Sequence, residues 1–304
     1  MDGVFCTIVS KFRAFQAIAL FISLKNVMPE LLVYVLCIDD STYNLLSKMN
    51  FNNINLIHIN ELADDMLEEI KTKRKLNEYC WTLKPVFIEK LFKEIPKIQR
   101  ITYIDADLFF FSDPSIIFKS QEDSSVLLSR GEIIIPMLPL PLVNILQELM
   151  GNYNSGFISF KRDKSALDCI GWWKQSCLNS CISRPEAGKF GDQKYLDNMP
   201  GMFDSVKDIS TPGVNIGHWN NSNHVFGFIN DVLCVDEDIL ICYHFSGFRI
   251  LKNGSILKIH EADRLYIPFF YEIYADVIVN IVNTVNSIYP DFDGYSTEED
   301  LSAK

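Results

Sequence analysis

Short apolar runs alternate with segments of helical period through about the first 100 residues, and this alternation constrains the fold more than any other feature. The runs VFCTIVS, LLVYVLCI and INLIHI, at residues 4–10, 31–38 and 54–59, have the length and composition of buried strands. Residues 12–26, between the first two runs, repeat apolar side chains at helical spacing. Parallel neighbours in a sheet need crossover helices of this kind. The pattern therefore predicts an α/β protein with a mostly parallel central sheet covered by helices.

Length and charge narrow the class of protein further. A chain of 304 residues with 48% apolar and 22% charged residues can bury a large globular core. Its net charge of −11 argues against nucleic acid as a partner, because binding phosphates along a strand needs a clustered basic surface. An anionic substrate would need a local countercharge, such as a metal ion.

The cysteines and the absence of long apolar windows indicate the compartment. The eight cysteines form no CxxC pair, and several lie inside apolar runs, so we expect buried thiols in a reducing compartment. No window approaches the roughly 18 apolar residues of a membrane span, and the N-terminus lacks the pattern of a signal peptide. These features predict a cytoplasmic protein, with any membrane contact peripheral at the inner membrane face.

The second half of the chain is less regular. Residues 154–160 (NSGFISF) are predicted to form a strand, residues 165–181 a helix, and residues from Asp192 a short helix. Residues 238–247 (DILICYHFSG) are expected to form a late strand that ends on His244. An amphipathic segment from Tyr266 to about Ile288 is expected to pack as a helix against the core rather than on a membrane.

We expect one domain over residues 1–290, because no linker or internal repeat interrupts it. Its predicted parts are two halves, residues 1–125 and 126–262, and a C-terminal helix at residues 263–290. The acidic residues 291–304 are predicted to be a flexible tail.

Two acids one residue apart follow an apolar strand in ITYIDADLFFFSDP, residues 101–114. A carboxylate is costly to bury alone, so Asp105 and Asp107 must face water, a cation or a hydrogen-bonding loop. Ligands of open α/β sheets bind beyond the carboxyl ends of strands, and acids in D-x-D spacing on an extended strand can reach one hard cation. Most D-x-D pairs are solvated turn acids, but the strand before this pair favours a metal site.

Five motifs in a fixed order resemble the nucleotide-sugar glycosyltransferases of GT-A fold, near the retaining family that includes glycogenin and bacterial lipopolysaccharide galactosyltransferases. They are TYIDADLFFFSDPSIIF, WTLKPVFIEKLF, YNSGFISF, GDQKYL and HFSG, and the resemblance covers roughly residues 4 to 250. It implies a hexosyltransferase that uses Mn²⁺ or Mg²⁺ and a nucleoside-diphosphate sugar, a UDP-sugar, as donor. The acceptor it implies is a glycan, a lipid-linked sugar or a protein, with retention of anomeric configuration. It also implies that residues 1–125 are a nucleotide-binding half and that residues 126–262 bind the donor sugar and the acceptor.

The resemblance also implies the metal ligands. Asp107 matches the direct ligand of the D-x-D motif, and Asp105 matches the acid shared between the ribose and the metal. His244, in YHFSG, matches the third protein ligand. The alternative for His244 is an ordinary core or surface histidine.

Further residues match positions that contact the donor in this family. Thr7 and Ser10 match the nucleobase contacts at the first strand end, and Asn154 and Ser155 match the N-S-G turn beside the donor sugar. Lys84 matches a cation that neutralises the diphosphate or holds the first acid of the D-x-D pair, with a solvated helix lysine as the alternative.

Two more positions complete the implied site. The family continues H-x-x-G-x-x-K-P-W where this chain reads HFSGFRILK, so Arg249 or Lys252 would replace the diphosphate-binding lysine. Asp192 and Gln193 match the catalytic D-Q pair beside the anomeric carbon, although Asp192 is also a good helix N-cap. In a retaining reaction both would give electrostatic support, whereas in an inverting one Asp192 would be the general base.

Two other functions remain open at this point. A haloacid-dehalogenase-type phosphatase also has D-x-D at a strand end and a later G-D-x-x-x-x-D, present from Gly191 to Asp197. Phe109, where that family has Thr or Val, and the three strands before the acids argue against it. The second alternative is a non-catalytic nucleotide-sugar-binding protein.

Overall fold

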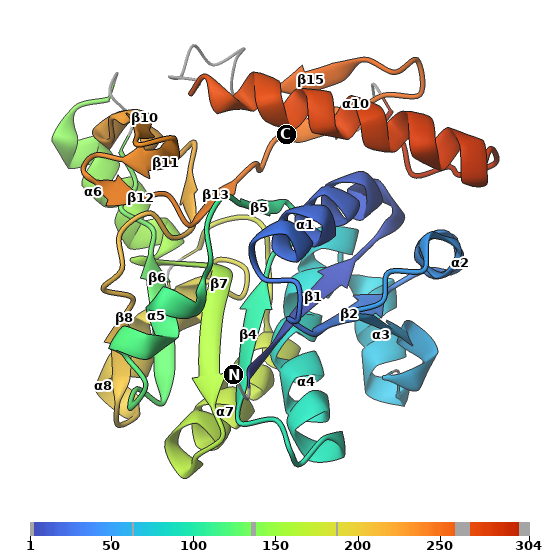
Figure 1. Ribbon diagram of the computed structural model, residues 1–304. Helices are drawn as coiled ribbons and strands as arrows, with labels where there is room; N and C mark the ends of the chain where they lie inside the picture. The colour runs from blue at the N-terminus through green and yellow to red at the C-terminus, as the bar shows by residue number, and fades with distance from the viewer. Residues whose placement is uncertain (1–2, 63, 135–137, 187, 259–267, 298–304) are drawn as a thin grey trace.

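The centre of the molecule is a seven-stranded sheet (Figure 1). The structure is a computed structural model that describes residues 3–62, 64–134, 138–186, 188–258 and 268–297. In sheet order the strands are β3 (Ile54–His58), β2 (Val33–Cys37), β1 (Gly3–Val9), β4 (Arg100–Ile104), β7 (Tyr153–Lys161), β6 (Val126–Arg130) and β8 (Val206–Asp208).

Most neighbours in this sheet are parallel. β1 pairs in parallel with β2 and β4, β2 with β3, and β6 with β8. β7 runs antiparallel to both β4 and β6. The mostly parallel α/β sheet predicted from the sequence is therefore confirmed.

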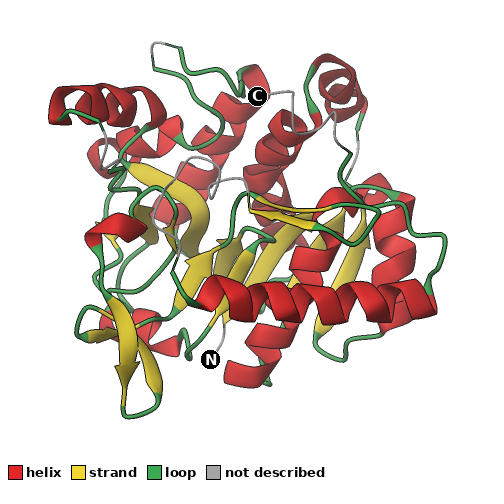
Figure 2. Ribbon diagram, turned by 90° about the horizontal axis from the view of Figure 1, so that it is seen from above, coloured by secondary structure: helices red, strands yellow, loops and turns green. Residues whose placement is uncertain are grey.

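Helices cover both faces of the sheet (Figure 2). Successive side chains of a strand point to opposite faces, and β1 shows this directly. Phe5 and Val9 belong to a core cluster with helices α1 and α10, whereas Cys6 and Ile8 belong to a second cluster with α4 and α7. The α-helices are α1 (Ala14–Val27), α2 (Asp40–Met49), α3 (Asp65–Lys73), α4 (Leu76–Glu94), α5 (Ser115–Ser120), α6 (Leu140–Met150), α7 (Lys164–Asn179), α8 (Met199–Met202) and α10 (Phe270–Ile288). Short 3₁₀ turns are η1 (Lys11–Arg13), η2 (Ile59–Glu61), η3 (Lys194–Asn198) and η4 (Asn221–Asn223).

Small sheets beside the main one bring distant segments together. One consists of β5 (Leu108–Phe110), β13 (Cys242–His244) and β9 (Ile216–Gly217), and it sets His244 opposite Leu108. The others join β10 (Phe226–Ile229), β11 (Val232–Val235) and β12 (Asp238–Ile239), and β14 (Phe248–Ile250) with β15 (Ile256–Lys258). The late strand predicted in residues 238–247 does end at His244, but it is two strands, β12 and β13, rather than one. The chain changes sheets between β12 and β13, where the Ile241 N–H bonds to the Gly213 carbonyl at 2.9 Å.

The two acids lie in a turn rather than on an extended strand. β4 ends at Ile104, and the Leu108 N–H donates to the Asp105 carbonyl at 3.1 Å. The expectation of acids after a strand end is correct, but their convergence comes from the turn and not from strand alternation.

The C-terminal region packs more tightly than predicted. The predicted helix begins at Phe270, and Tyr266 lies outside the described residues. Residues 291–297 are not frayed: the Phe292 side chain is buried with its ring centroid 5.4 Å from that of Phe15, and the Ser296 N–H donates to the Ile250 carbonyl at 2.8 Å. The rest of the expected tail, 298–304, is outside the described residues.

The structure bears on two expectations from the sequence, the state of the cysteines and the absence of long apolar segments. The eight cysteines are free, and seven are buried while Cys80 is half-buried. Among the described helices, none is long and apolar enough to cross a membrane.

Candidate active site

A pocket of about 1130 Å³ opens where β1 and β4 end. This is the edge at which open α/β sheets bind ligands. Among the predicted site residues, those that line the pocket are Ser10, Lys84, Asp105, Asp107, Asn154, Ser155, Asp192, Gln193, His244 and Arg249.

Thr7 and Lys252 do not line this pocket. Thr7 lies within β1 and is fully buried, and its hydroxyl has no hydrogen-bond partner among the described residues. Lys252 is exposed just after β14. The structure therefore gives no support to a nucleobase contact by Thr7 or a diphosphate contact by Lys252.

Asp105, Asp107 and His244 form a cluster whose ligand atoms all lie within 4.8 Å of one another. His244 Nε2 is 2.9 Å from Asp107 Oδ1 and 3.8 Å from Asp105 Oδ2. The antiparallel pairing of β5 with β13 brings these positions together. Neighbouring ligands around a metal at about 2.1 Å are about 3 Å apart, so these separations suit a shared cation.

Asn215 orients the imidazole. The amide nitrogen of Asn215 donates to Ser129 Oγ at 2.8 Å and to Asn154 Oδ1 at 2.9 Å, which directs its oxygen at His244 Nδ1, 3.0 Å away. The Asn215 oxygen can only accept a hydrogen bond, so His244 Nδ1 carries a proton. When the His244 ring is neutral, Nε2 therefore has no proton and its lone pair points toward the two carboxylates. A lone pair facing carboxylates needs a proton or a metal ion between them. Two carboxylates and one imidazole are suitable ligands for Mn²⁺ or Mg²⁺.

Gly156 allows the histidine to sit this close to β7. A Cβ atom at Gly156 would lie 2.6 Å from His244 Cε1 and 2.8 Å from Asn154 Oδ1. The Gly156 N–H donates to Asn154 Oδ1 at 2.8 Å, and the Asp105 N–H donates to the Gly156 carbonyl at 2.8 Å. The N-S-G residues lie in strand β7 rather than in the turn that the sequence resemblance implied, and from this strand they hold the D-x-D turn and leave space for the ring.

In this cluster the neighbouring charges favour the ionised form of Asp107 and the protonated form of His244. Burial raises the pKa of Asp107, but His244 and Arg13 outweigh it and hold the pKa below its ordinary value. Burial lowers the pKa of His244, but Asp107 outweighs it and raises the pKa. Arg13, whose Nε is 3.8 Å from Asp107 Oδ2, adds a cation that the sequence reading missed.

Lys84 is a buried cation between two acids. Its Nζ lies 3.0 Å from Asp105 Oδ1 and 3.4 Å from Asp192 Oδ2, and it donates to Ser155 Oγ at 3.1 Å. The side chain is only 2% exposed, so the alternative of a solvated helix lysine is wrong. Burial lowers the pKa of Lys84, but the two carboxylates outweigh it and raise the pKa.

Asp192 is almost fully buried at the pocket wall. Its Oδ2 has no hydrogen bond among the described residues, and burial raises its pKa although Lys84 opposes the shift. The residue does not cap a helix, because the 3₁₀ turn that follows begins at Lys194 and Gln193 is its N-cap. The Gln193 amide donates to the Met150 carbonyl at 3.1 Å. The D-Q pair is thus held in place at the pocket.

Part of the pocket lining consists of residues to which the sequence analysis assigned no role, although Trp81 belongs to the motif WTLKPVFIEKLF. We call Lys75, Trp81, Arg184 and Phe190 the outer wall, and Asp105, Asp107 and His244 the metal-side wall. The Trp81 and Phe190 ring centroids are 6.4 Å apart. These residues come from the start of α4 and the loop after α7, so only the fold brings them together.

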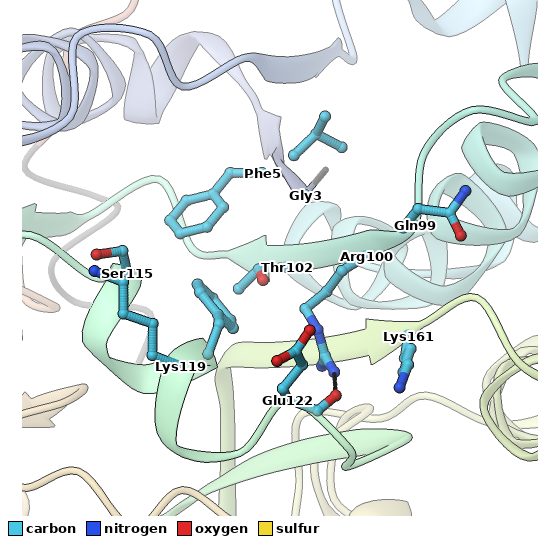
Figure 3. Close-up of a pocket in the computed structure, with 11 residues that line it drawn as sticks. Gly3, Phe5, Gln99, Arg100, Thr102, Ser115, Lys119, Glu122 and Lys161 are labelled. Atoms are coloured by element: carbon cyan, nitrogen blue, oxygen red, sulfur yellow. Dashed lines mark hydrogen bonds between the residues drawn. The ribbon is translucent and has the colours of Figure 1, made fainter. Parts of the chain in front are cut away.

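A smaller pocket, about 420 Å³, lies at the opposite ends of the same strands (Figure 3). It includes Gly3 and Arg100, the first residues of β1 and β4. Arg100 is already engaged, since it donates to the carbonyls of Ser124 and Glu122 at 2.7 and 3.1 Å. The candidate chemistry is therefore at the carboxyl ends of the strands.

Known structures define the class of fold. An active-site mutant of LgtC has a TM-score of 0.55 at 12% identity, with 92% of this chain and 95% of that chain covered. The bifunctional glycosyltransferase WbbM has a TM-score of 0.54 at 14% identity, over 94% of this chain and 51% of that chain. The galactosyltransferase LgtC in complex with donor and acceptor sugar analogs has a TM-score of 0.51 at 11% identity, over 88% and 98%. The chain has the GT-A fold of glycosyltransferases.

The particular family follows from sequence identity. YfnF of Bacillus subtilis (strain 168), an uncharacterized protein, is 44% identical over 301 residues, 99% of each chain. YfnD of the same organism, also uncharacterized, is 30% identical over 297 residues, 96% of this chain and 94% of its own. The chain belongs to the family of YfnF and YfnD. No family model matches it.

The phosphatase alternative does not fit this structure. The fold is that of GT-A proteins, and Asp197, the last acid of the G-D-x-x-x-x-D pattern, does not line the pocket. Asp197 instead accepts from the Asn152 N–H at 2.7 Å and pairs with Lys194 at 2.9 Å.

Proposed function

We propose that this chain is a metal-dependent glycosyltransferase that moves a hexose from a nucleoside-diphosphate sugar, a UDP-sugar, to an acceptor glycan, lipid-linked sugar or protein. The observation that carries the proposal is the meeting of two charged assemblies in one pocket. The first is the Asp105, Asp107 and His244 cluster, and the second is Lys84 with Asp192.

The metal-side wall would hold Mn²⁺ or Mg²⁺, which when bound supplies positive charge to the diphosphate leaving group. Lys84 and Arg13 present further positive charge beside the same acids, at 3.0 Å from Asp105 and 3.8 Å from Asp107. Arg249 lines the same pocket and would be the diphosphate-binding cation in this proposal. Fixed cations stabilise the charge that develops on the leaving phosphate without reorganising.

Asp192 and Gln193 would face the sugar. Asp192 Oδ2 is buried without a hydrogen bond among the described residues, and Lys84, 3.4 Å away, is its charged partner, so the pocket wall keeps a carboxylate with a free accepting position. Negative charge at this point stabilises a sugar that becomes oxocarbenium-like as its bond to phosphate breaks. This supports catalysis over the non-catalytic alternative. Ser10, Asn154 and Ser155, which line the pocket, would contact the donor.

We also propose retention of anomeric configuration. In a reaction on the leaving-group face, the departing phosphate can accept the acceptor's proton, so the partner beside the anomeric carbon need not be a base. Lys84 is 3.4 Å from Asp192 and holds it as an ion pair, which suits electrostatic support better than proton abstraction. Proton NMR of the new anomeric signal tests this: an α-linked product from a UDP-α-sugar is expected, and a β-linked product would make Asp192 the general base.

The first test of the function is binding and turnover of the donor. A panel of nucleoside diphosphates should raise the melting temperature only when Mn²⁺ or Mg²⁺ is present, because a ligand that binds only the native state stabilises it. Donor hydrolysis should then require the metal and stop with EDTA. Full turnover of donor without metal would contradict the proposal.

A further inference from the structure

The outer wall carries positive charge that the donor does not need. The chain as a whole has 39 acidic and 28 basic residues, yet lysine and arginine outnumber acids along this pocket. The basic residues are Arg13, Lys75, Lys84, Arg184 and Arg249, and the acids are Asp105, Asp107 and Asp192.

The acids near the metal-side wall are balanced by cations that do not belong to the outer wall. Arg13 and Lys84 lie beside the three acids, and with Arg249 they offset them. A divalent metal ion offsets the two charges of the donor's diphosphate. Lys75 and Arg184 are therefore surplus once donor and metal are bound. Neither forms an ion pair with any described residue.

The fold holds these two cations on one wall. Glu78, in the first turn of α4, accepts from the Ser183 N–H at 2.7 Å and from its hydroxyl at 2.8 Å. This ties Lys75, just before α4, to Arg184, just after Ser183. The Glu78 carboxylate offsets part of the positive charge of the outer wall, but Glu78 does not line the pocket. The nearest acid on the loop, Glu186, does not line it either.

The pocket also has room for a second ligand with an apolar face. Its volume of about 1130 Å³ exceeds the roughly 300–1,000 Å³ of typical small-molecule sites. Trp81 and Phe190 line the same pocket and provide aromatic surface there. The Trp81 ring packs on Gly191, where a Cβ would lie 3.2 Å from Trp81 Cε3. Aromatic side chains of this kind offer large, rigid contact area.

We propose that the outer wall binds the acceptor and that the acceptor is an anionic saccharide, in which a carboxylate or a phosphate contacts Lys75 and Arg184 while a sugar ring packs on Trp81. The inference rests on the proposed function, because it places the acceptor beside Asp192. The anionic group has two chemical sources, a uronic acid within a glycan or a phosphate, either free or in a lipid-linked sugar.

Binding of defined probes tests the inference without knowledge of the natural acceptor. The full chain is saturated with Mn²⁺ and the nucleoside diphosphate that stabilises it most, which blocks the donor's phosphate site. It is then titrated with methyl glucoside, methyl glucuronide, glucose 6-phosphate and an octyl-diphosphate-linked glucose. At least one anionic probe should bind about tenfold more tightly than methyl glucoside, and the preference should fall as salt rises. The anionic probe that binds most tightly shows whether the outer wall prefers a carboxylate, a free phosphate or a lipid-linked phosphate.

Variants show whether the outer wall causes the preference. Lys75→Ala and Arg184→Ala should each lower the ratio of anionic to neutral affinity about fivefold, and the double variant should remove it. Lys75→Arg should restore most of the ratio. Lys189→Ala is the matched control, because Lys189 is exposed on the loop after α7 but does not line the pocket.

The outcomes separate this inference from the function on which it rests. If no nucleoside diphosphate binds with metal, the proposed function fails. If one binds but no anionic probe is preferred over methyl glucoside, including the case in which no probe binds, the anionic acceptor is wrong. An equal loss of preference in Lys189→Ala would also overturn the role of the outer wall.

Discussion

The two walls of the pocket differ in how firmly they are held. On the metal-side wall, His244 is fixed by Asn215 and Asp107, at 3.0 and 2.9 Å, and is only 6% exposed. On the outer wall, Lys75 and Arg184 are exposed. The difference fits the two proposed roles. In the proposed function, the charges that meet a developing charge are preorganised, whereas the wall proposed to bind the acceptor keeps adaptable side chains.

The largest effect should come from the buried cation that joins the metal-side wall to Asp192. Lys84→Met removes the partner of Asp105 and Asp192, and breaking a buried ion pair costs about 3–5 kcal/mol. Donor turnover should fall at least about a thousandfold, and chemical denaturation should show the loss of stability. Lys93→Met, on the exposed side of the same helix, is the control.

A double variant separates the two roles of Lys84. Lys84→Met with Asp192→Asn removes one unpaired charge, so it should recover part of the stability but none of the turnover. Recovery of both would mean that Lys84 acts only on stability.

Substitution of Asp107, a proposed metal ligand, should affect function far more than folding. Asp107→Asn keeps a hydrogen-bonding group beside His244 but loses the carboxylate for the cation, so Mn²⁺ affinity should fall about a hundredfold and turnover with it. Calorimetric titration with Mn²⁺ and a melting curve measure the two. Asp123→Asn, at an exposed position, is the control. Unfolding of the variant with unchanged metal dependence would identify Asp107 as a structural acid.

The metal-side wall could be predicted from the sequence better than the outer wall, because its residues lie in short local motifs. Asp105, Asp107 and His244 lie in short motifs that end strands, so local pattern and family resemblance found them. Asn215 was missed because it acts through His244 from a loop with no strand or helix signal, in left-handed backbone at φ 57°. Lys75 and Arg184 are far apart in sequence, and only the Glu78 to Ser183 contact brings them to one wall.

The fold shows the same contrast. The regular strand and helix alternation from β1 to β4 was predictable because each apolar run is continuous. The end of the late strand at His244 was predicted, but its division into β12 and β13 was missed because an apolar run does not show where the chain changes partners. The packing of 291–297 was missed because it depends on Phe292 meeting Phe15, a contact that composition cannot indicate.

A medium effect is expected where the metal-side wall is most crowded. In Gly156→Ala the new Cβ would lie 2.6 Å from His244 Cε1, and the ring cannot yield without losing Asn215 or Asp107. Mn²⁺ affinity should fall about tenfold to a hundredfold, as for changes in groups that orient metal ligands. Gly171→Ala, in α7 with nothing within 4 Å of its Cβ, is the matched control and should bind Mn²⁺ normally. Normal Mn²⁺ affinity in Gly156→Ala would show that the wall is less rigid than the contacts indicate.

The smallest effect on folding should come from the outer wall, and two arginines make the comparison direct. Arg184 is exposed and forms no ion pair or side-chain hydrogen bond with the described residues, so Arg184→Ala should change the free energy of unfolding by less than about 0.5 kcal/mol. Arg74 instead donates to the Cys177 and Leu178 carbonyls at 2.7 and 2.6 Å and to the Thr82 hydroxyl. Hydrogen bonds from a charged group are worth about 1.5–3 kcal/mol each, so Arg74→Ala should destabilise the protein by at least that amount. Urea denaturation of both variants gives the two values, and equal losses would mean that the outer wall is part of the stable framework rather than an adaptable surface.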